Sequence, residues 1–323
     1  MRVRQDILMI MAAAAIATAG CASQPATTFS TTRAAPSGAV TSHVVVISVD
    51  GLRPDAIARF GAVALQRLMR AGSFSLEART IALSTTLPSH TSMLTGQLME
   101  DHGVVWNTDE TATRGRITVP TVFGIARQHG FRTAAFFSKS KFNHLMSHGT
   151  LDHGQAPGAE GRWSADRTID GVERYMATAQ PNLLFVHIGE PDYAGHLLGW
   201  MSWWYARGVR TADAAVERIV SAADRAYGPA NYTLIVTADH GGHGRTHGTG
   251  SAEDVTIPWI AYGRGVRSGV TLAPGIHTVD TAATILWLLG LSPATWGTGT
   301  PVREAFTDAA QRTVDDVGAR HTR

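Results

Sequence analysis

Short runs of consecutive apolar residues alternate along the chain with longer segments in which apolar residues recur at helical spacing. Since apolar and polar residues do not alternate within the short runs, each run is typical of a strand buried on both faces. The predicted strands are Val44–Val49, Thr133–Phe137, Leu183–Ile188, Tyr232–Thr237 and Ile257–Tyr262. The predicted helices are Asp55–Ala71, Pro120–His129, Ser164–Thr178, Thr211–Tyr227 and Thr278–Leu289. This alternation predicts an α/β fold with a mostly parallel central sheet and helices on both faces.

Three of the predicted strands run directly into carboxylate and imidazole side chains. They are Asp50 after the first strand, Asp192 and His196 after the third, and Asp239, His240 and His247 after the fourth. The carboxyl ends of parallel strands meet at one edge of a sheet, where ligands gather. Carboxylates and imidazoles without thiolates suit zinc or a harder ion such as manganese. Each residue alone is as typical of a capped turn, but six at three strand ends favour a metal site.

A fourth segment, Ser84–Gly96, supplies a candidate nucleophile. It is typical of a turn that opens a helix, with Pro88 near the start, where a missing N–H costs nothing. The free N–H groups and dipole of a helix start attract an anion. A threonine hydroxyl at this point needs a metal ion to favour its alkoxide. Thr85 and Thr86 are equally typical of a helix N-cap, so this segment alone leaves both interpretations open.

The motifs take a specific order: Asp50-Gly51, Thr86-x-Pro-Ser-His90, Asp192-x-x-x-His196, Asp239-His240-Gly241 and His247-Gly248. In this order they resemble the alkaline phosphatase superfamily, most closely its type I phosphodiesterase / nucleotide pyrophosphatase branch, from Val44 to Leu291. The resemblance implies an alkaline phosphatase-like fold and two divalent ions, zinc or alternatively manganese. It also implies hydrolysis of phosphodiester or nucleotide pyrophosphate bonds in a small substrate, through a phospho-threonine intermediate.

The resemblance also assigns roles residue by residue. One metal ion falls to Asp192, His196 and His247, and the other to Asp50, Asp239 and His240. Thr86 is the implied nucleophile, and Asn107 the implied contact to a phosphoryl oxygen. His243 follows His240 too closely for a ligand position, so we expect it behind a ligand or facing solvent.

Two further segments bear on the substrate. Ser138-Lys139-Ser140-Lys141-Phe142 departs from the nucleotide pyrophosphatase pattern and resembles the Lys-x-Lys pair with which phosphonoacetate hydrolases hold a second anionic group. It is equally typical of a solvated loop, and a phosphomonoester or phosphonate substrate is the alternative. Trp200, Trp203, Trp204 and Tyr205 form either an aromatic wall for the leaving group or ordinary core. A sulfatase is disfavoured, because Thr86 and His90 stand where sulfatases carry Cys or Ser and Arg.

Composition and the N-terminal segment indicate the compartment. The 28 Lys and Arg residues nearly balance 26 Asp and Glu residues without a basic cluster, which argues against a nucleic-acid polymer as partner. The single cysteine, Cys21, excludes an intramolecular disulfide and a thiolate metal site. The stretch Ile7–Ala19 is shorter than the ~20 residues of a membrane span. With the small residues before Cys21 it is typical of a secretory signal and resembles a bacterial lipobox.

The chain therefore divides into four predicted parts. Residues 1–20 are a signal peptide of lipoprotein type, 21–42 a flexible Ser/Thr/Ala/Pro tether, 43–300 a metal-dependent phosphohydrolase domain and 301–323 a polar tail. We expect an exported protein, periplasmic or tethered to the outer membrane through a lipid on Cys21, and secreted without that lipid. A non-catalytic metal-binding lipoprotein is the distant alternative. The sequence does not indicate the oligomeric state.

Overall fold

The computed structural model describes residues 38–321 except 160 and 293–296, without the side chains of 315–321. The predicted signal segment, Cys21 and all but the last residues of the tether lie outside the described residues. No helix in the described part of the chain is long and apolar enough to cross a membrane.

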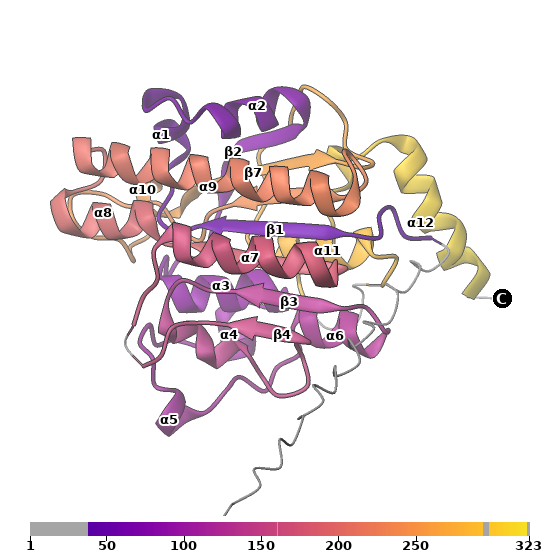
Figure 1. Cartoon of the computed structure of the whole chain (residues 1–323), viewed down its shortest axis with the longest axis horizontal. Coiled ribbons are helices and arrows are strands. Elements are labelled where there is room, and N and C mark those ends of the chain that lie inside the picture. The colour runs from indigo at the N-terminus through magenta and orange to yellow at the C-terminus, as the bar shows by residue number, and fades with distance from the viewer. Residues whose placement is uncertain (1–37, 160, 293–296, 322–323) are drawn as a thin grey trace, which may run out of the picture. The chain divides into compact units, whose positions relative to one another are not determined.

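A single eight-stranded sheet forms the centre of the fold, in the order β4-β3-β5-β1-β6-β7-β2-β8 (Figure 1). The strands are β1 Val44–Val49, β2 Ser73–Arg79, β3 Thr133–Phe136, β4 His153–Gln155, β5 Leu183–Ile188, β6 Thr233–Thr237, β7 Thr256–Gly263 and β8 Val270–Thr271. All pairings are parallel except those of β7 with β6 and β2. The predicted, mostly parallel sheet is confirmed.

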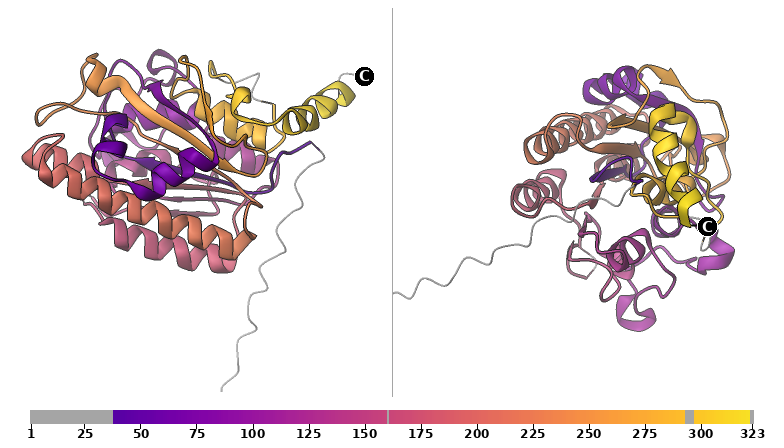
Figure 2. Two further views of the ribbon diagram at one scale, coloured as in Figure 1. Left: turned by 90° about the horizontal axis from the view of Figure 1, so that it is seen from above. Right: turned by 90° about the vertical axis from the view of Figure 1, so that its right-hand side faces the viewer.

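Helices cover both faces of this sheet, as predicted. On one face α7 and α9 lie side by side, and α3, α6 and α11 lie on the other (Figures 1 and 2). The helices are α1 Pro54–Arg59, α2 Val63–Ala71, α3 Thr86–Thr95, α4 Met99–His102, α5 Thr111–Arg114, α6 Val122–Gln128, α7 Ala165–Ala179, α8 Glu190–Leu198, α9 Trp203–Tyr227, α10 Ala252–Val255, α11 Asp280–Leu288 and α12 Asp308–His321, with 3-10 turns η1 Ser140–Leu145 and η2 Arg303–Ala305.

Some elements differ from the hydrophobic pattern for identifiable reasons. The predicted helix Asp55–Ala71 is broken into α1 and α2 at Gly61, whose φ is +67°. Helix α9 begins before the predicted Thr211, because the Ser202 side chain accepts a hydrogen bond from Tyr205 N and caps it. β2 was not predicted, since buried and exposed residues are mixed along it. β7 follows β6 through a loop without a long crossover helix, so it returns antiparallel.

The register of the central strands fixes the functional edge of the sheet. β1 lies between β5 and β6, parallel to both, with Val49 opposite Ile188 and Ser48 opposite Thr237. All three strands are completely buried, as their continuous apolar runs predict. Their carboxyl ends therefore meet at one edge, which confirms the predicted convergence.

The packed body continues beyond residue 300. Val302, Phe306 and Ala310 are buried in the hydrophobic core, and the Phe306 ring lies 5.0 Å from the Trp287 ring, between centroids. The segment expected as a polar tail thus contains η2 and α12, and its first part contributes apolar side chains to the core.

Candidate active site

Three buried aspartates meet where β1, β5 and β6 end. Asp50 and Asp239 have no exposed surface, and Asp192 is only 4% exposed. In the described structure, one oxygen of each carboxylate has no hydrogen-bond partner: Asp50 Oδ1, Asp192 Oδ1 and Asp239 Oδ2. Burying unpaired carboxylate oxygens is costly unless a cation binds them. The arrangement therefore fits metal ions.

Imidazole nitrogens complete two groups of closely spaced donor atoms. Asp50, Asp239 and His240 form one, and Asp192, His240 and His247 the other, each with its donor atoms within 4.8 Å of one another. His240 Nε2 lies 3.4 Å from Asp50 Oδ1 and 3.2 Å from Asp239 Oδ2. His240 thus lies between the two groups, and its ring stacks on that of His247 with centroids 3.7 Å apart.

The sixth predicted ligand, His196, lies at the more open end of the site. Its Nε2 is 3.3 Å from Asp192 Oδ1 and 3.1 Å from His247 Nε2, and its side chain is 45% exposed. His247 Nε2 is in turn 3.5 Å from Asp192 Oδ1. All six predicted ligands therefore converge, and Asp192, His196 and His247 face one small space.

The tautomers of these histidines suit metal binding. Each Nδ1 donates to a backbone carbonyl: His240 to Gly241 O at 2.8 Å, His247 to Ser84 O at 2.8 Å and His196 to Arg245 O at 3.1 Å. The Nε2 lone pairs are then left to face the carboxylates. The 3.1 Å approach of His196 Nε2 to His247 Nε2 brings two acceptors together, which a cation between them would relieve.

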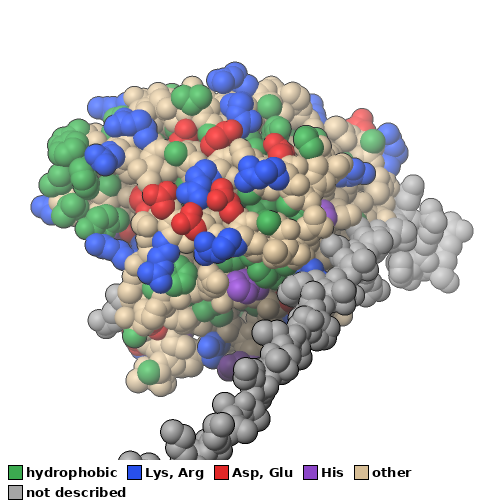
Figure 3. All heavy atoms as spheres, viewed as in Figure 1, with side chains coloured by type: hydrophobic (Ala, Val, Ile, Leu, Met, Phe, Trp, Pro, Cys, Tyr) green, Lys and Arg blue, Asp and Glu red, His purple; other side chains and the backbone are tan. Residues whose placement is uncertain are grey.

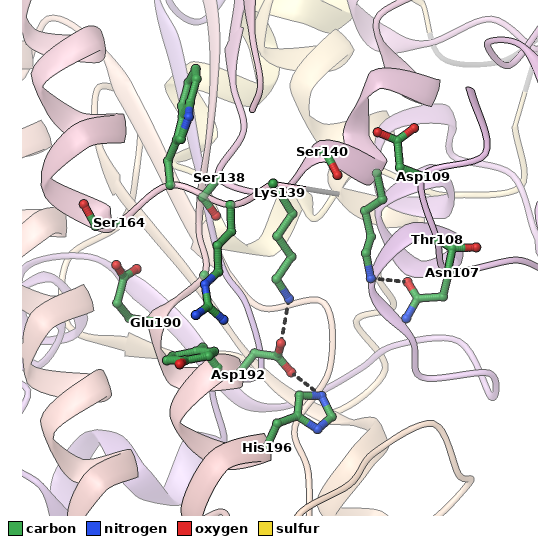
Figure 4. Close-up of a pocket in the computed structure, with 16 residues that line it drawn as sticks. Asn107, Thr108, Asp109, Ser138, Lys139, Ser140, Ser164, Glu190, Asp192 and His196 are labelled. Atoms are coloured by element: carbon green, nitrogen blue, oxygen red, sulfur yellow. Dashed lines mark hydrogen bonds and ion pairs between the residues drawn. The ribbon is translucent and has the colours of Figure 1, made fainter. Parts of the chain in front are cut away.

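Electrostatics in the site also favour bound cations. Lys139 Nζ lies 2.6 Å from Asp192 Oδ2 (Figure 4) and also 2.6 Å from Asp50 Oδ2. Burial alone would raise the pKa of Asp50, but Lys139 and His187 hold that pKa well below its usual range. Burial and the charge of Asp50 instead raise the pKa of Asp239. Lys139 thus contacts two of the three buried carboxylates, Asp50 and Asp192, and no lysine contacts Asp239 among the described residues, which leaves negative charge that suits divalent ions.

Burial keeps two of the imidazoles neutral. It lowers the pKa of His240, and together with His240 it lowers the pKa of His247 to about 4. The more exposed His196 has a raised pKa because the Asp192 carboxylate lies 3.3 Å from its Nε2. Neutral His240 and His247 are ready to act as ligands at ordinary pH.

Thr86 is the first residue of α3, and its hydroxyl points into this site. Thr86 is 1% exposed, and its Oγ1 lies 3.4 Å from His240 Nε2. Thr85 occupies the N-cap position, but its side chain makes no capping hydrogen bond. The buried Thr86 hydroxyl therefore has the position of a nucleophile at a helix start.

The other wall of the site is a pocket of about 950 Å³ that opens beside Asp192 and His196 (Figure 4). Asn107, Lys139 and Lys141 all line it. Asn107 Oδ1 accepts from Leu87 N at 2.9 Å and from Lys141 Nζ at 3.0 Å, which ties the pocket to the first turn of α3. Burial and the neighbouring Lys139 lower the pKa of Lys141 to about 8. The two lysines therefore belong to the site and not to a solvated loop.

The aromatic residues after His196 divide between core and surface. Trp200 Nε1 and Tyr205 Oη both donate to the carbonyl of Gly51, at 3.0 and 2.8 Å. Gly51 has φ +71°, and a Cβ there would lie 2.9 Å from Asp192 Cα. Trp200 and Tyr205 thus brace the turn after Asp50, because both hydrogen bonds hold the carbonyl of Gly51 in place. Trp203, by contrast, is 69% exposed, and none of these four aromatic residues lines the pocket.

Sequence reasoning missed several residues that orient the ligands. His187 donates through Nε2 to Asp50 Oδ2 at 2.8 Å, and its Nδ1 accepts from Ser138 Oγ at 2.7 Å. His90 donates to Thr86 O at 2.7 Å. A histidine within an otherwise apolar buried strand was the available signal for His187. His243, expected outside the ligand set, donates to Asp254 Oδ1 at 2.8 Å.

The sequence matches the family profile of type I phosphodiesterases / nucleotide pyrophosphatases over residues 44–246, well over half of its length. The chain belongs to this family. A sulfatase profile matches residues 204–291, which do not include Thr86. Both families lie in the alkaline phosphatase superfamily, so the predicted resemblance is confirmed.

This member of the phosphodiesterase family is similar to several ectonucleotide pyrophosphatases/phosphodiesterases. It is 26% identical over 180 residues to ectonucleotide pyrophosphatase/phosphodiesterase family member 7 of Rattus norvegicus, covering 49% of this chain and 40% of the relative. To the human member 7 this chain is 24% identical over 218 residues, which cover 62% of this chain and 48% of the human protein. A bis(5'-adenosyl)-triphosphatase of Xenopus laevis is 35% identical over 72 residues, covering 22% and 16%. The chain thus spans less than half the length of these relatives.

Solved structures share the fold. Murine ectonucleotide pyrophosphatase/phosphodiesterase 5, solved as an inactive variant in complex with AMP, gives a TM-score of 0.70 at 17% identity, covering 82% of this chain and 100% of that one. A 2-O GAG sulfatase gives a TM-score of 0.66 at 14% identity, and the match covers 82% of this chain and 74% of the sulfatase. These matches confirm the predicted alkaline phosphatase-like fold class.

Proposed function

We propose that this chain hydrolyses phosphodiester or nucleotide pyrophosphate bonds through a phospho-threonine intermediate on Thr86, with two divalent metal ions. The observation that carries the proposal is the convergence of three unpaired carboxylate oxygens and the Nε2 lone pairs of His240, His247 and His196 beside the buried Thr86 hydroxyl. Family membership and the AMP bound by a murine structural neighbour favour a nucleotide-like phosphate ester.

The predicted ligand sets fit the donor atoms. Asp50, Asp239 and His240 would hold one ion beside Thr86, and Asp192, His196 and His247 the other. Bound zinc or manganese would supply Lewis-acid charge that lowers the pKa of the threonine hydroxyl and of water and neutralises phosphoryl oxygens.

The remaining steps are carried by residues of the chain itself. Thr86 Oγ1 would attack phosphorus, forming the Thr86 O–P bond as the P–O bond to the leaving alcohol or phosphate breaks. The backbone N–H of Thr86 and the amide NH2 of Asn107, whose Oδ1 accepts from Leu87 N, would donate to the phosphoryl oxygens. Water would then cleave the phospho-threonine, returning the proton to Thr86 and releasing phosphate or a monoester.

Neighbouring threonines provide the test. Thr86→Ala should lower turnover of bis-p-nitrophenyl phosphate by roughly a thousand-fold or more, with metal content by elemental analysis still near that of wild type. Thr85→Ala removes an equally buried hydroxyl that makes no hydrogen bond, and should keep most activity. Full activity in Thr86→Ala, or equal loss in both variants, would refute the assignment.

A second candidate is a phosphomonoesterase or a phosphonoacetate hydrolase-like enzyme. Lys141 favours it, because this half-buried ammonium lines the pocket and is bonded to the neutral Asn107 side chain. It could hold a second anionic group of the substrate. Rates on bis-p-nitrophenyl phosphate, p-nitrophenyl phosphate and phosphonoacetate would separate the two candidates. Metal binding without cleavage of any ester would favour the non-catalytic alternative.

Export and anchoring also remain proposals. The layout of residues 1–21 supports the proposal of a lipid on Cys21, with 21–42 as tether and the protein in the periplasm or at the outer membrane, or secreted without that lipid. Detergent partitioning of membranes from cells expressing wild type or Cys21→Ala tests this. A Cys21→Ala chain that partitions like wild type would show that no acyl group is attached there.

A further inference from the structure

Large apolar side chains are exposed at one place close to the pocket. Of the seven exposed large hydrophobics among the described residues, four fall within α8 and the first residue of α9: Tyr193 at 40%, Leu197 at 40%, Leu198 at 48% and Trp203 at 69%. These four residues are termed the α8–α9 patch. Figure 3 shows hydrophobic side chains gathered at this end of the molecule. Such a gathering marks an interaction surface more often than isolated apolar residues do.

The rim of the α8–α9 patch is cationic. The Arg162 guanidinium lies 3.6 Å from the Tyr193 ring centroid, and that of Arg207 lies 5.5 Å from the ring of Trp204. Arg245 donates to the carbonyl of His196 at 3.1 Å. All three arginines are exposed, and none forms an ion pair with a carboxylate of the described residues. An anionic surface therefore complements the rim.

We propose that the α8–α9 patch docks on the surface of a lipid bilayer that contains anionic lipids. Trp and Leu that project from helix ends, with Arg beside them, match the composition of interfacial membrane contacts. The four side chains expose only on the order of a few hundred Å². A stable protein dimer buries about 800 Å² per partner, so a second copy fits this small patch less well.

Docking would have a consequence for access to the pocket. Tyr193 belongs to the α8–α9 patch and also lines the pocket. His196, which directly precedes the patch residue Leu197, lines the pocket too. A bilayer on the patch would thus place the pocket mouth near lipid head groups. This contact is separate from an anchor at Cys21, and it does not depend on the proposed hydrolysis.

The test uses the full chain with vesicles of phosphatidylcholine containing a minority of phosphatidylglycerol. Hydrogen exchange should slow in peptides covering residues 193–207 when vesicles are added, and stay unchanged around Val63, another exposed apolar residue. Because exchange is read locally, binding through the N-terminal segment does not mask the result. Slowed exchange only elsewhere would overturn the proposal.

Matched variants separate the patch from general hydrophobicity. Measured in chains that also carry Cys21→Ala, so that the proposed lipid is absent, Leu198→Glu and Trp203→Glu should each lower the vesicle-bound fraction by roughly ten-fold, and Val63→Glu should leave it unchanged. The glutamate at Trp203 lies in the first turn of α9, where an acidic side chain suits the helix dipole. Equal binding by all three variants would refute the proposal. So would sedimentation showing that the patch variants dissociate a dimer in the absence of vesicles, since the occupant would then be a second copy.

Discussion

The two walls of the active site are built in different ways. The strand-end wall, made of Asp50, Asp239 and His240, is completely buried and continues directly from the central strands. The loop wall, made of Asn107, Lys141 and their surroundings, is only partly buried and comes from a loop and a 3-10 turn. Packing of the sheet fixes the first wall, whereas a few side-chain bonds hold the second. The difference suggests that the strand-end wall sets the chemistry and the loop wall the choice of substrate.

The largest effect is expected on the strand-end wall. Asp239→Asn removes a charge from one donor group and should lower both bound metal and turnover, the latter by roughly a thousand-fold. Asp213→Asn is the matched control. Asp213 is also buried, but its carboxylate accepts from Ala64 N and Leu65 N at the start of α2. Elemental analysis and bis-p-nitrophenyl phosphate turnover provide the readouts. Metal content equal to wild type in Asp239→Asn would exclude it as a ligand.

An intermediate effect is expected where an aromatic residue braces this wall. Tyr205→Phe removes the hydroxyl that donates to Gly51 O and accepts from Arg53 N at 3.0 Å. Because the turn after Asp50 would loosen, metal affinity should fall by about ten-fold, as for other outer partners of ligands. Tyr227→Phe, at the far end of α9, removes a hydroxyl bonded to Pro181 O and should leave affinity unchanged. Titration with zinc in a competing chelator measures both. Equal affinities for the two variants would mean that the brace has no role.

On the loop wall the expected effect is smaller and depends on the substrate. Lys141→Gln removes a cation from the pocket and should raise the KM for phosphonoacetate by about ten-fold, with little change for bis-p-nitrophenyl phosphate. Steady-state kinetics on both substrates provide the check. Equal changes for both would place Lys141 in catalysis and not in selection of the leaving group.

The same contrast explains how much the sequence could predict. The continuous apolar runs of β1, β5 and β6 indicated buried parallel strands, so the convergence of Asp50, Asp192 and Asp239 followed from chain order alone. Asn107 came only from resemblance, and the lysines from resemblance and their place after a predicted strand, because a loop carries no periodicity that locates its side chains. The brace from Tyr205 to Gly51 O joins residues far apart in the sequence through a side-chain bond, which no local pattern reveals.

Local order along the loop wall also depends on His102, which follows α3 and precedes Asn107. Its Nδ1 accepts from Val104 N at 3.1 Å, and its Nε2 donates to Ser92 Oγ at 2.9 Å. The bond from Val104 N needs the neutral ring, because a protonated Nδ1 cannot accept. Burial lowers the pKa of His102 to about 4, below its ordinary value of 6.5. The contribution of His102 to stability is therefore fully present above pH 6.5, and it is lost as the pH falls toward 4, where the unfolded chain takes up the proton first.

The pH dependence of unfolding is the finest test of this wall. Between pH 7 and pH 5, His102 should account for a loss of about 2 kcal/mol in the free energy of unfolding. The side chain in His102→Asn cannot titrate. The free energy of unfolding in urea should therefore change less between pH 7 and pH 5 in this variant than in wild type, by that amount. His148→Asn replaces an exposed histidine bonded to Arg116 and should keep the wild-type dependence. If His102→Asn kept it too, the pKa of His102 would have to be the same in the folded and the unfolded chain, and its bond from Val104 N could not hold the segment that leads to Asn107.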